Sequence, residues 1–163
     1  WYTIIMSDPD NQSTESNPVG RFMVATGAII EHEATGKILL LKRSEELDWH
    51  PGDWELHYGR IAQFEDPEDG LKREINEETG IKDISIKRLL SSKHIYRGQK
   101  KKENDLIILT YYCTTQETDV MISEEHSAFE WVDAQEAIER VPVEGVKKDI
   151  LEYLDYKALI SRS

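Results

Sequence analysis

The stretch GRIAQFEDPEDGLKREINEETGI, residues 59–81, decides the fold of this chain. Its middle predicts a helix. Asp66 is a good N-cap residue, and Pro67 suits the first helical position because its fixed φ is already helical. Gly80 is a natural C-terminal stop, since glycine adopts the left-handed conformation without strain. The stretch therefore predicts a helix that begins near Asp66 and ends at Gly80.

The predicted helix carries three glutamates on one face. With Glu74 placed at zero on a helical wheel, Glu77 lies at about −60° and Glu78 at about +40°, so they share an arc of roughly 100°. Like charges at this spacing cost about 0.2–0.5 kcal/mol per pair. Leu71 and Ile75 flank the arc and give the helix an apolar stripe to bury. The glutamates are either a solvated acidic face or a site for a hard cation such as Mg²⁺, which prefers a few carboxylates plus substrate phosphate.

Other site motifs do not fit the chain. A calcium-binding EF-hand loop centred on Gly70 would need acidic ligands at Pro67 and Asn76, and neither residue is acidic. The segment at residues 34–38, ATGKI, lacks the upstream glycine and the Ser or Thr of a phosphate-binding P-loop. No Cys/His spacing predicts zinc, and no G-x-S-x-G element predicts a serine nucleophile.

Strand-like runs lie on both sides of the helix. Their β-branched and aromatic residues predict strands at 21–32, 38–44, 84–97, 105–115 and 129–133. Residues 44–66 have no steady period and contain Pro and Gly, which predicts mostly loop. Two helices are expected at the end of the chain, over 134–141 and 146–160. The order of strands, one helix, strands and helices favours an α/β fold with helices packed on a mixed sheet, rather than a doubly wound parallel fold.

Composition narrows the class of partner. The chain has 163 residues, enough for one domain, and its 20 basic and 32 acidic residues give a net charge of −12. That charge disfavours nucleic acids and anionic membranes as main partners. A single cysteine, Cys113, cannot form an internal disulfide, and no apolar run reaches membrane-spanning length. We expect a cytoplasmic protein with a flexible polar leader at 1–18 and one domain at 19–163.

The box at 59–81 resembles a known family. The pattern of Gly, Glu, Arg-Glu-Ile, Glu-Glu and Gly-Ile at fixed spacing is similar to a complete Nudix box, with every defining position filled: Gly59, Glu65, Arg73, Glu74, Ile75, Glu77, Glu78, Gly80 and Ile81. The flanking segments 54–56 and 124–137 also look like Nudix proteins, so the resemblance covers about residues 20–160. It implies an α/β/α sandwich with a mixed sheet, in which the box forms a loop, a helix and a loop.

The resemblance also implies an activity. Most Nudix proteins use Mg²⁺ or Mn²⁺ to hydrolyse a nucleoside diphosphate linked to another group, by attack of water on a phosphorus. By this resemblance Glu77 and Glu78 are metal ligands, and Glu74 is a further ligand or helps to activate water. The carbonyl of Tyr58 is expected to face the metal. The partner would be a small nucleotide substrate, and a homodimer is possible.

The remaining implied roles concern orientation and a proton acceptor. Arg73 and Glu65 are expected to orient the helix, and Arg73 can pair with Glu65 or Glu77. Gly59 is expected to allow a tight turn. Relatives often take one more carboxylate from a loop in the C-terminal half, as base or ligand. Glu125 is favoured for that role over Glu124, and the alternative is that both are solvated loop acids.

The chain departs from the family pattern before the box. Many relatives have Pro-Gly or Gly-Gly where this sequence has His57-Tyr58, and Phe64 replaces a small residue. Two alternatives to a hydrolase stay open, the first of them because of His57-Tyr58. One is a non-catalytic Nudix domain that binds a nucleotide or a partner protein. The other is isopentenyl diphosphate isomerase, which expects a cysteine near the start of the box, whereas Cys113 lies far along the chain.

Overall fold

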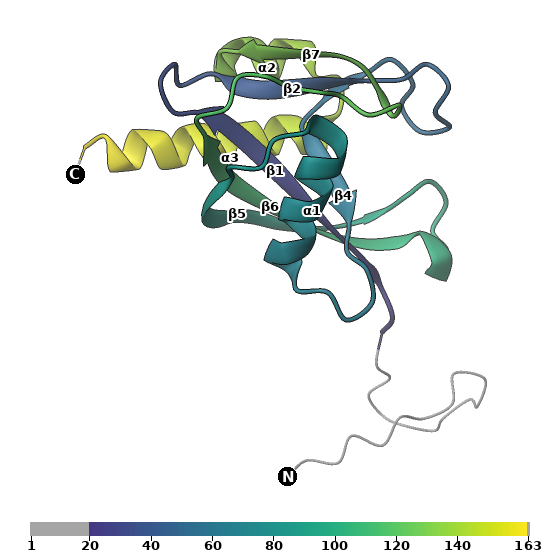
Figure 1. The fold of residues 1–163 in the computed structure, drawn as a ribbon. Coiled ribbons are helices and arrows are strands. Elements are labelled where there is room, and N and C mark those ends of the chain that lie inside the picture. The colour runs from purple at the N-terminus through teal and green to yellow at the C-terminus, as the bar shows by residue number, and fades with distance from the viewer. Residues whose placement is uncertain (1–19, 163) are drawn as a thin grey trace.

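The computed structural model describes residues 20–162, in which seven strands form one mixed sheet. The predicted leader at 1–18 lies outside these residues. Strand β1 (Met23–His32) runs through the middle of the sheet, as Figure 1 shows. It pairs in parallel with β6 (Asp105–Thr115) and antiparallel with β2 (Ile38–Arg43) and β4 (His57–Arg60). The parallel central pair and the antiparallel neighbours confirm the predicted mixed sheet.

The outer strands complete the sheet on both sides. Strand β5 (Ser85–Tyr96) pairs antiparallel with β6, and the turn between them holds a short 3₁₀ helix, η1 (Lys102–Asn104). On the other side, β2 pairs antiparallel with β3 (Trp54–Glu55) and with β7 (His126–Val132). Strand β7 begins at His126, three residues before the predicted start at 129, because this first part of the strand pairs with the end of β2.

The prediction that 44–66 is mostly loop is confirmed, but it missed the two short strands β3 and β4. Both strands are too short to show an alternating pattern of their own. Strand β4 exists because its backbone pairs with β1 in the register Tyr58 to Gly27. The local sequence does not indicate this pairing, because β1 is distant from β4 in the sequence.

Helices cover both faces of the sheet. Helix α1 (Pro67–Thr79) lies on one face, and α2 (Ala134–Arg140) and α3 (Glu144–Ile160) lie on the other (Figure 1). Alternate residues of β1 supply the two cores: Ala28 packs in the cluster that contains α1, and Ile29 packs in the cluster that contains α2 and α3. This arrangement confirms the predicted α/β/α sandwich. Nowhere in residues 20–162 is a helix both long enough and apolar enough to cross a bilayer.

The ends of α1 are fixed by the predicted residues. The Asp66 carboxylate accepts a hydrogen bond from the Glu68 N–H at 2.9 Å, and Pro67 is the first helical residue. Gly80 has a φ of 72° and donates its N–H to the Asn76 carbonyl at 2.9 Å. The box therefore forms the expected loop, helix and loop. Its helix presents the three glutamates beside β4.

Candidate metal and substrate site

Arg73 ties the loop before α1 to the helix. Its Nε and Nη2 donate to the two Glu65 oxygens at 2.7 and 2.8 Å, and Glu65 also accepts from the Ala62 N–H at 2.8 Å. The hydrogen bonds from Arg73 are the main reason that the pKa of Glu65 falls to about 2, and Glu65 in turn raises the pKa of Arg73. Nη1 donates to Glu74 at 2.9 Å and to Glu77 at 3.2 Å. Arg73 thus makes both of the alternative pairings that the sequence allowed.

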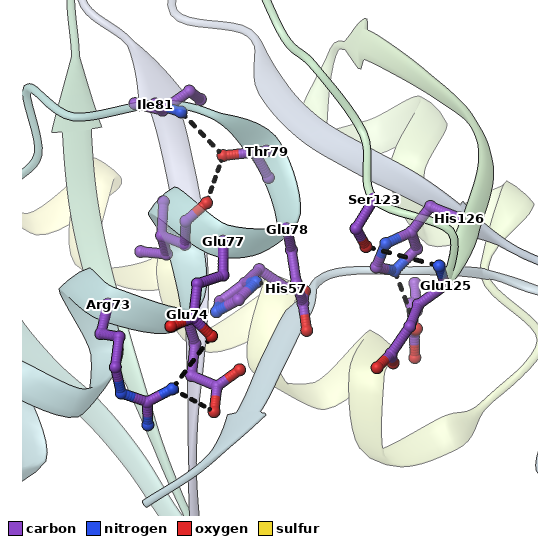
Figure 2. Close-up of polar contacts among 12 residues, drawn as sticks. His57, Arg73, Glu74, Glu77, Glu78, Thr79, Ile81, Ser123, Glu125 and His126 are labelled. Carbon is purple, nitrogen blue, oxygen red and sulfur yellow. Dashed lines mark hydrogen bonds and ion pairs between the residues drawn. The ribbon is translucent and has the colours of Figure 1, made fainter.

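The three glutamates of α1 differ in depth. The Glu77 side chain is 56% exposed, that of Glu74 is 18% exposed and that of Glu78 is 11% exposed. Figure 2 shows Glu78 beside His57, whose Nδ1 lies 2.8 Å from Glu78 Oε2. The predicted cluster is therefore one face of a helix that runs from a solvated acid to a buried one.

Gly59 is needed for the approach of α1 to β4. A Cβ atom at this position would lie 2.4–2.6 Å from the Cβ, Cγ and Cδ atoms of Glu74, closer than any real contact. The tight turn predicted at Gly59 is absent, because the residue lies within β4 opposite Thr26. Glycine is required here for space.

A cleft of about 480 Å³ opens beside these residues. Acidic, basic, aromatic and apolar side chains line it. The acidic residues include Glu74, Glu78, Glu125, Glu55 and Asp53. The basic residues include Arg43, Arg60, Lys93 and Arg97, and the aromatic residues include Trp49, Trp54 and Tyr58. Glu77 is not among the lining residues. Carboxylates can bind a metal ion, cationic side chains can bind phosphates, and aromatic rings can stack on a planar base, so the cleft holds the groups that all three would need.

Glu125 is brought to the cleft and its neighbour Glu124 is not. Glu125 lines the cleft, and its carbonyl accepts the Ser44 N–H at 2.8 Å, which fixes this loop to the end of β2. In Figure 2, Glu125 and Glu78 come from different segments and face the same region. Glu124 is exposed. His126 is buried, with Nε2 3.6 Å from a Glu55 oxygen, and does not line the cleft.

Polar atoms without a hydrogen bond lie where β1 and β4 meet α1. Five buried side-chain polar atoms of residues 20–162 lack a hydrogen bond, and four of them belong to Thr26, His57 and Glu78. The His57 and Glu78 atoms are close but lack the alignment of a hydrogen bond. Buried polar groups usually have a partner. Of these residues only Glu78 lines the cleft, and its carboxylate together with that of Glu74 suits a divalent cation that keeps its water shell.

The carboxylates are not yet arranged around one point. Within the part of the chain that the structure describes, no three acidic, His or Cys side chains converge as a metal cluster. Mg²⁺ keeps several waters and takes few protein ligands, which suits an open set of acids. Binding a shared ion would require side-chain rotation of the glutamates.

Sequence reasoning missed a second set of polar residues under the cleft. Asp149 of α3 is 1% exposed and accepts hydrogen bonds from the hydroxyls of Tyr58, Ser91 and Thr110, at 2.8, 2.7 and 3.0 Å. It also forms an ion pair with Lys93. Burial, followed by the Asp149 charge, raises the pKa of Tyr58. The available signal was an aspartate on the apolar face of the last helix.

Comparison with known proteins agrees with this geometry. The family model for the NUDIX domain matches residues 21–154. A nucleoside triphosphatase NudI of Escherichia fergusonii is 34% identical over 107 residues, which is 62% of this chain and 76% of that protein. An octanoyltransferase of Myxococcus xanthus is 27% identical over 145 residues, 86% of this chain, and the chain spans 38% of its length. The crystal structure of a MutT protein from Methanosarcina mazei Go1 superposes with a TM-score of 0.69 at 24% identity, over 87% of this chain and 99% of that one, and so shares the fold.

Proposed function

The chain belongs to the Nudix family, and we propose that it is a Mg²⁺- or Mn²⁺-dependent pyrophosphohydrolase of a nucleoside diphosphate linked to another group. One observation carries the proposal. The acids of the box lie on one helix face, and Glu74 and Glu78 line the same cleft as Glu125. That cleft also holds cationic and aromatic side chains that suit phosphates and a base.

The α1 glutamates supply the ligands in this proposal. Glu77 and Glu78 hold the metal, Glu74 is a further ligand or activates water, and the Tyr58 carbonyl completes the set. A bound divalent cation neutralises pyrophosphate oxygens and lowers the pKa of its water. Phosphoryl transfer needs mainly this positioning and charge neutralisation.

Other residues of the chain orient these groups and accept the proton. Arg73 and Glu65 fix the loop to the helix, so that the glutamates keep their places beside β4. Glu125 is the proposed base or extra ligand, because it lines the cleft from a separate segment. Lys93 lines the cleft and is held by the buried Asp149, which places an ammonium group where a substrate phosphate can lie.

The isomerase alternative loses support from the position of the cysteine. Cys113 is fully buried in β6, and burial is the main reason that its pKa rises to about 12. A non-catalytic binding domain remains the alternative that activity must exclude. The single domain at 19–163, the cytoplasmic location and the homodimer remain predictions.

A substrate panel tests the proposal. The purified chain is incubated with Mg²⁺ and nucleoside triphosphates, deoxynucleoside triphosphates, ADP-ribose, NADH, nucleotide sugars and dinucleoside polyphosphates, and nucleoside monophosphate is measured. The relative named nucleoside triphosphatase puts the triphosphates first. We expect turnover that disappears in Glu77→Gln.

Matched variants test the proposed base. Glu125→Gln is expected to lose most of the turnover, and Glu124→Gln, at the neighbouring position outside the cleft, is expected to keep it. Silence of the wild-type protein across the panel, with Mn²⁺ still bound, would reject the hydrolase in favour of a binding domain. Equal rates for the two variants would remove Glu125 from the mechanism.

A further inference from the structure

His57 is a buried histidine in contact with a proposed metal ligand. Its side chain is 1% exposed, and Nδ1 lies 2.8 Å from Glu78 Oε2. Neither ring nitrogen has a hydrogen bond within the described residues, and Glu78 Oε2 has none either. A buried polar group without a partner costs about 1–3 kcal/mol, so its retention needs a reason.

The position of His57 on β4 directs it to the glutamates. Side chains alternate along a strand, so His57 and Gly59 share one face of β4. Gly59 meets Glu74 of α1 on that face, and His57 meets Glu78 one helical turn further along. Tyr58 between them reaches Asp149 of α3 on the other face. The two residues that depart from the family pattern therefore serve opposite sides of the sheet.

We propose that His57 is a positioning residue that holds Glu78 by donating Nδ1–H to Oε2, so that Oε1 is left for the divalent cation. This inference rests on the proposed function. Only Oε2 of Glu78 is a buried atom without a partner, and Glu78 lines the cleft. The distance already suits a hydrogen bond, and a small rotation of the carboxylate toward an ion supplies the missing alignment.

A purely structural histidine would have different properties. It would fill space in the core, and a hydrophobic residue of similar size would replace it without effect on metal binding. A positioning residue acts through its donor, so the place of the donor atom decides the outcome. The amide nitrogen of asparagine takes the place of Nδ1, whereas that of glutamine takes the place of Nε2.

Three variants separate these readings: His57→Leu, His57→Asn and His57→Gln. For each, the dissociation constant of Mn²⁺ is measured by electron paramagnetic resonance, and the melting temperature is measured without metal. We expect His57→Leu to weaken Mn²⁺ binding by about 10- to 100-fold, the usual effect of removing a residue that orients a ligand. His57→Asn should restore most of the affinity and His57→Gln should not.

The results of these measurements distinguish failure of this inference from failure of the proposed function. Wild-type affinity in His57→Leu would overturn the inference, and so would equal losses in all three variants or rescue by Gln in place of Asn. If Glu77→Gln abolishes turnover while the His57 variants bind Mn²⁺ normally, the inference fails and the proposed function stands. If the wild-type protein binds no Mn²⁺ in a Glu77-dependent way, both fail.

Discussion

Gly59→Ala should disable the site without adding or removing a charge. The new Cβ would lie 2.4 Å from Glu74 Cγ and 2.5 Å from Glu74 Cβ, about 1 Å closer than the 3.4 Å of ordinary contact. Rotation of the Glu74 side chain does not move its own Cβ, so α1 must shift away from β4. Overpacking of this kind costs about 1–3 kcal/mol. A displacement of about 1 Å in a catalytic group can lower the rate about 100-fold.

The assay compares Gly59→Ala with Gly36→Ala. Gly36 has a φ of 70° in the turn between β1 and β2, and nothing lies within 4 Å of a Cβ built there. Alanine at Gly36 costs about 1–2 kcal/mol of backbone strain without contact with the site. We expect both variants to melt earlier, and only Gly59→Ala to lose turnover and Mn²⁺ affinity. Wild-type turnover in Gly59→Ala, or equal losses in both, would refute the steric reasoning.

Three further predictions concern stability. Phe64 has a φ of 68° and is 99% exposed, so Phe64→Gly should relieve strain and gain about 1 kcal/mol, a rise of about 2–4 °C in melting temperature, while Phe64→Ala should not. The pKa of Glu65 is about 2 because Arg73 donates hydrogen bonds to it. The ionised Glu65 carboxylate therefore stabilises the fold at pH values above the ordinary carboxyl pKa of about 4.3, and this stabilisation is lost as the pH falls toward 2. By circular dichroism, Glu65→Gln should melt below wild type at pH 7, with a difference that shrinks between these pH values; a constant difference would refute this. Asp149→Asn should cost about 1–3 kcal/mol in urea unfolding, because an ionised acceptor is lost from a buried network, and an unchanged unfolding midpoint would contradict that.

Local signals made α1 predictable from the sequence. Its cap, its first proline, its terminal glycine and its apolar stripe all lie within the helix or next to it, and the structure follows them. Strand β4 was missed because HYGR is too short to alternate and contains a glycine. Its strand conformation comes from pairing with β1, far away in sequence.

The candidate site also has a part that could be predicted from the sequence and a part that could not. The spacing of Glu74, Glu77 and Glu78 fixes their common face, because helix geometry depends only on neighbours in sequence. The contact of His57 with Glu78 joins a strand to a helix. The hydrogen bond from the Tyr58 hydroxyl to Asp149 joins residues that are 91 positions apart in the sequence. Tertiary packing creates both contacts, so no pattern in a single sequence predicts them.

The central claim is that the α1 glutamates hold a divalent cation that is required for pyrophosphate hydrolysis. The most direct measurement is nucleoside monophosphate release by metal-free protein as Mg²⁺ is added back, for wild type and Glu78→Gln on the best panel substrate. The account predicts no turnover without metal, saturable recovery in wild type and little or none in the variant. Turnover in the presence of a chelator, or equal recovery in both proteins, would contradict the claim.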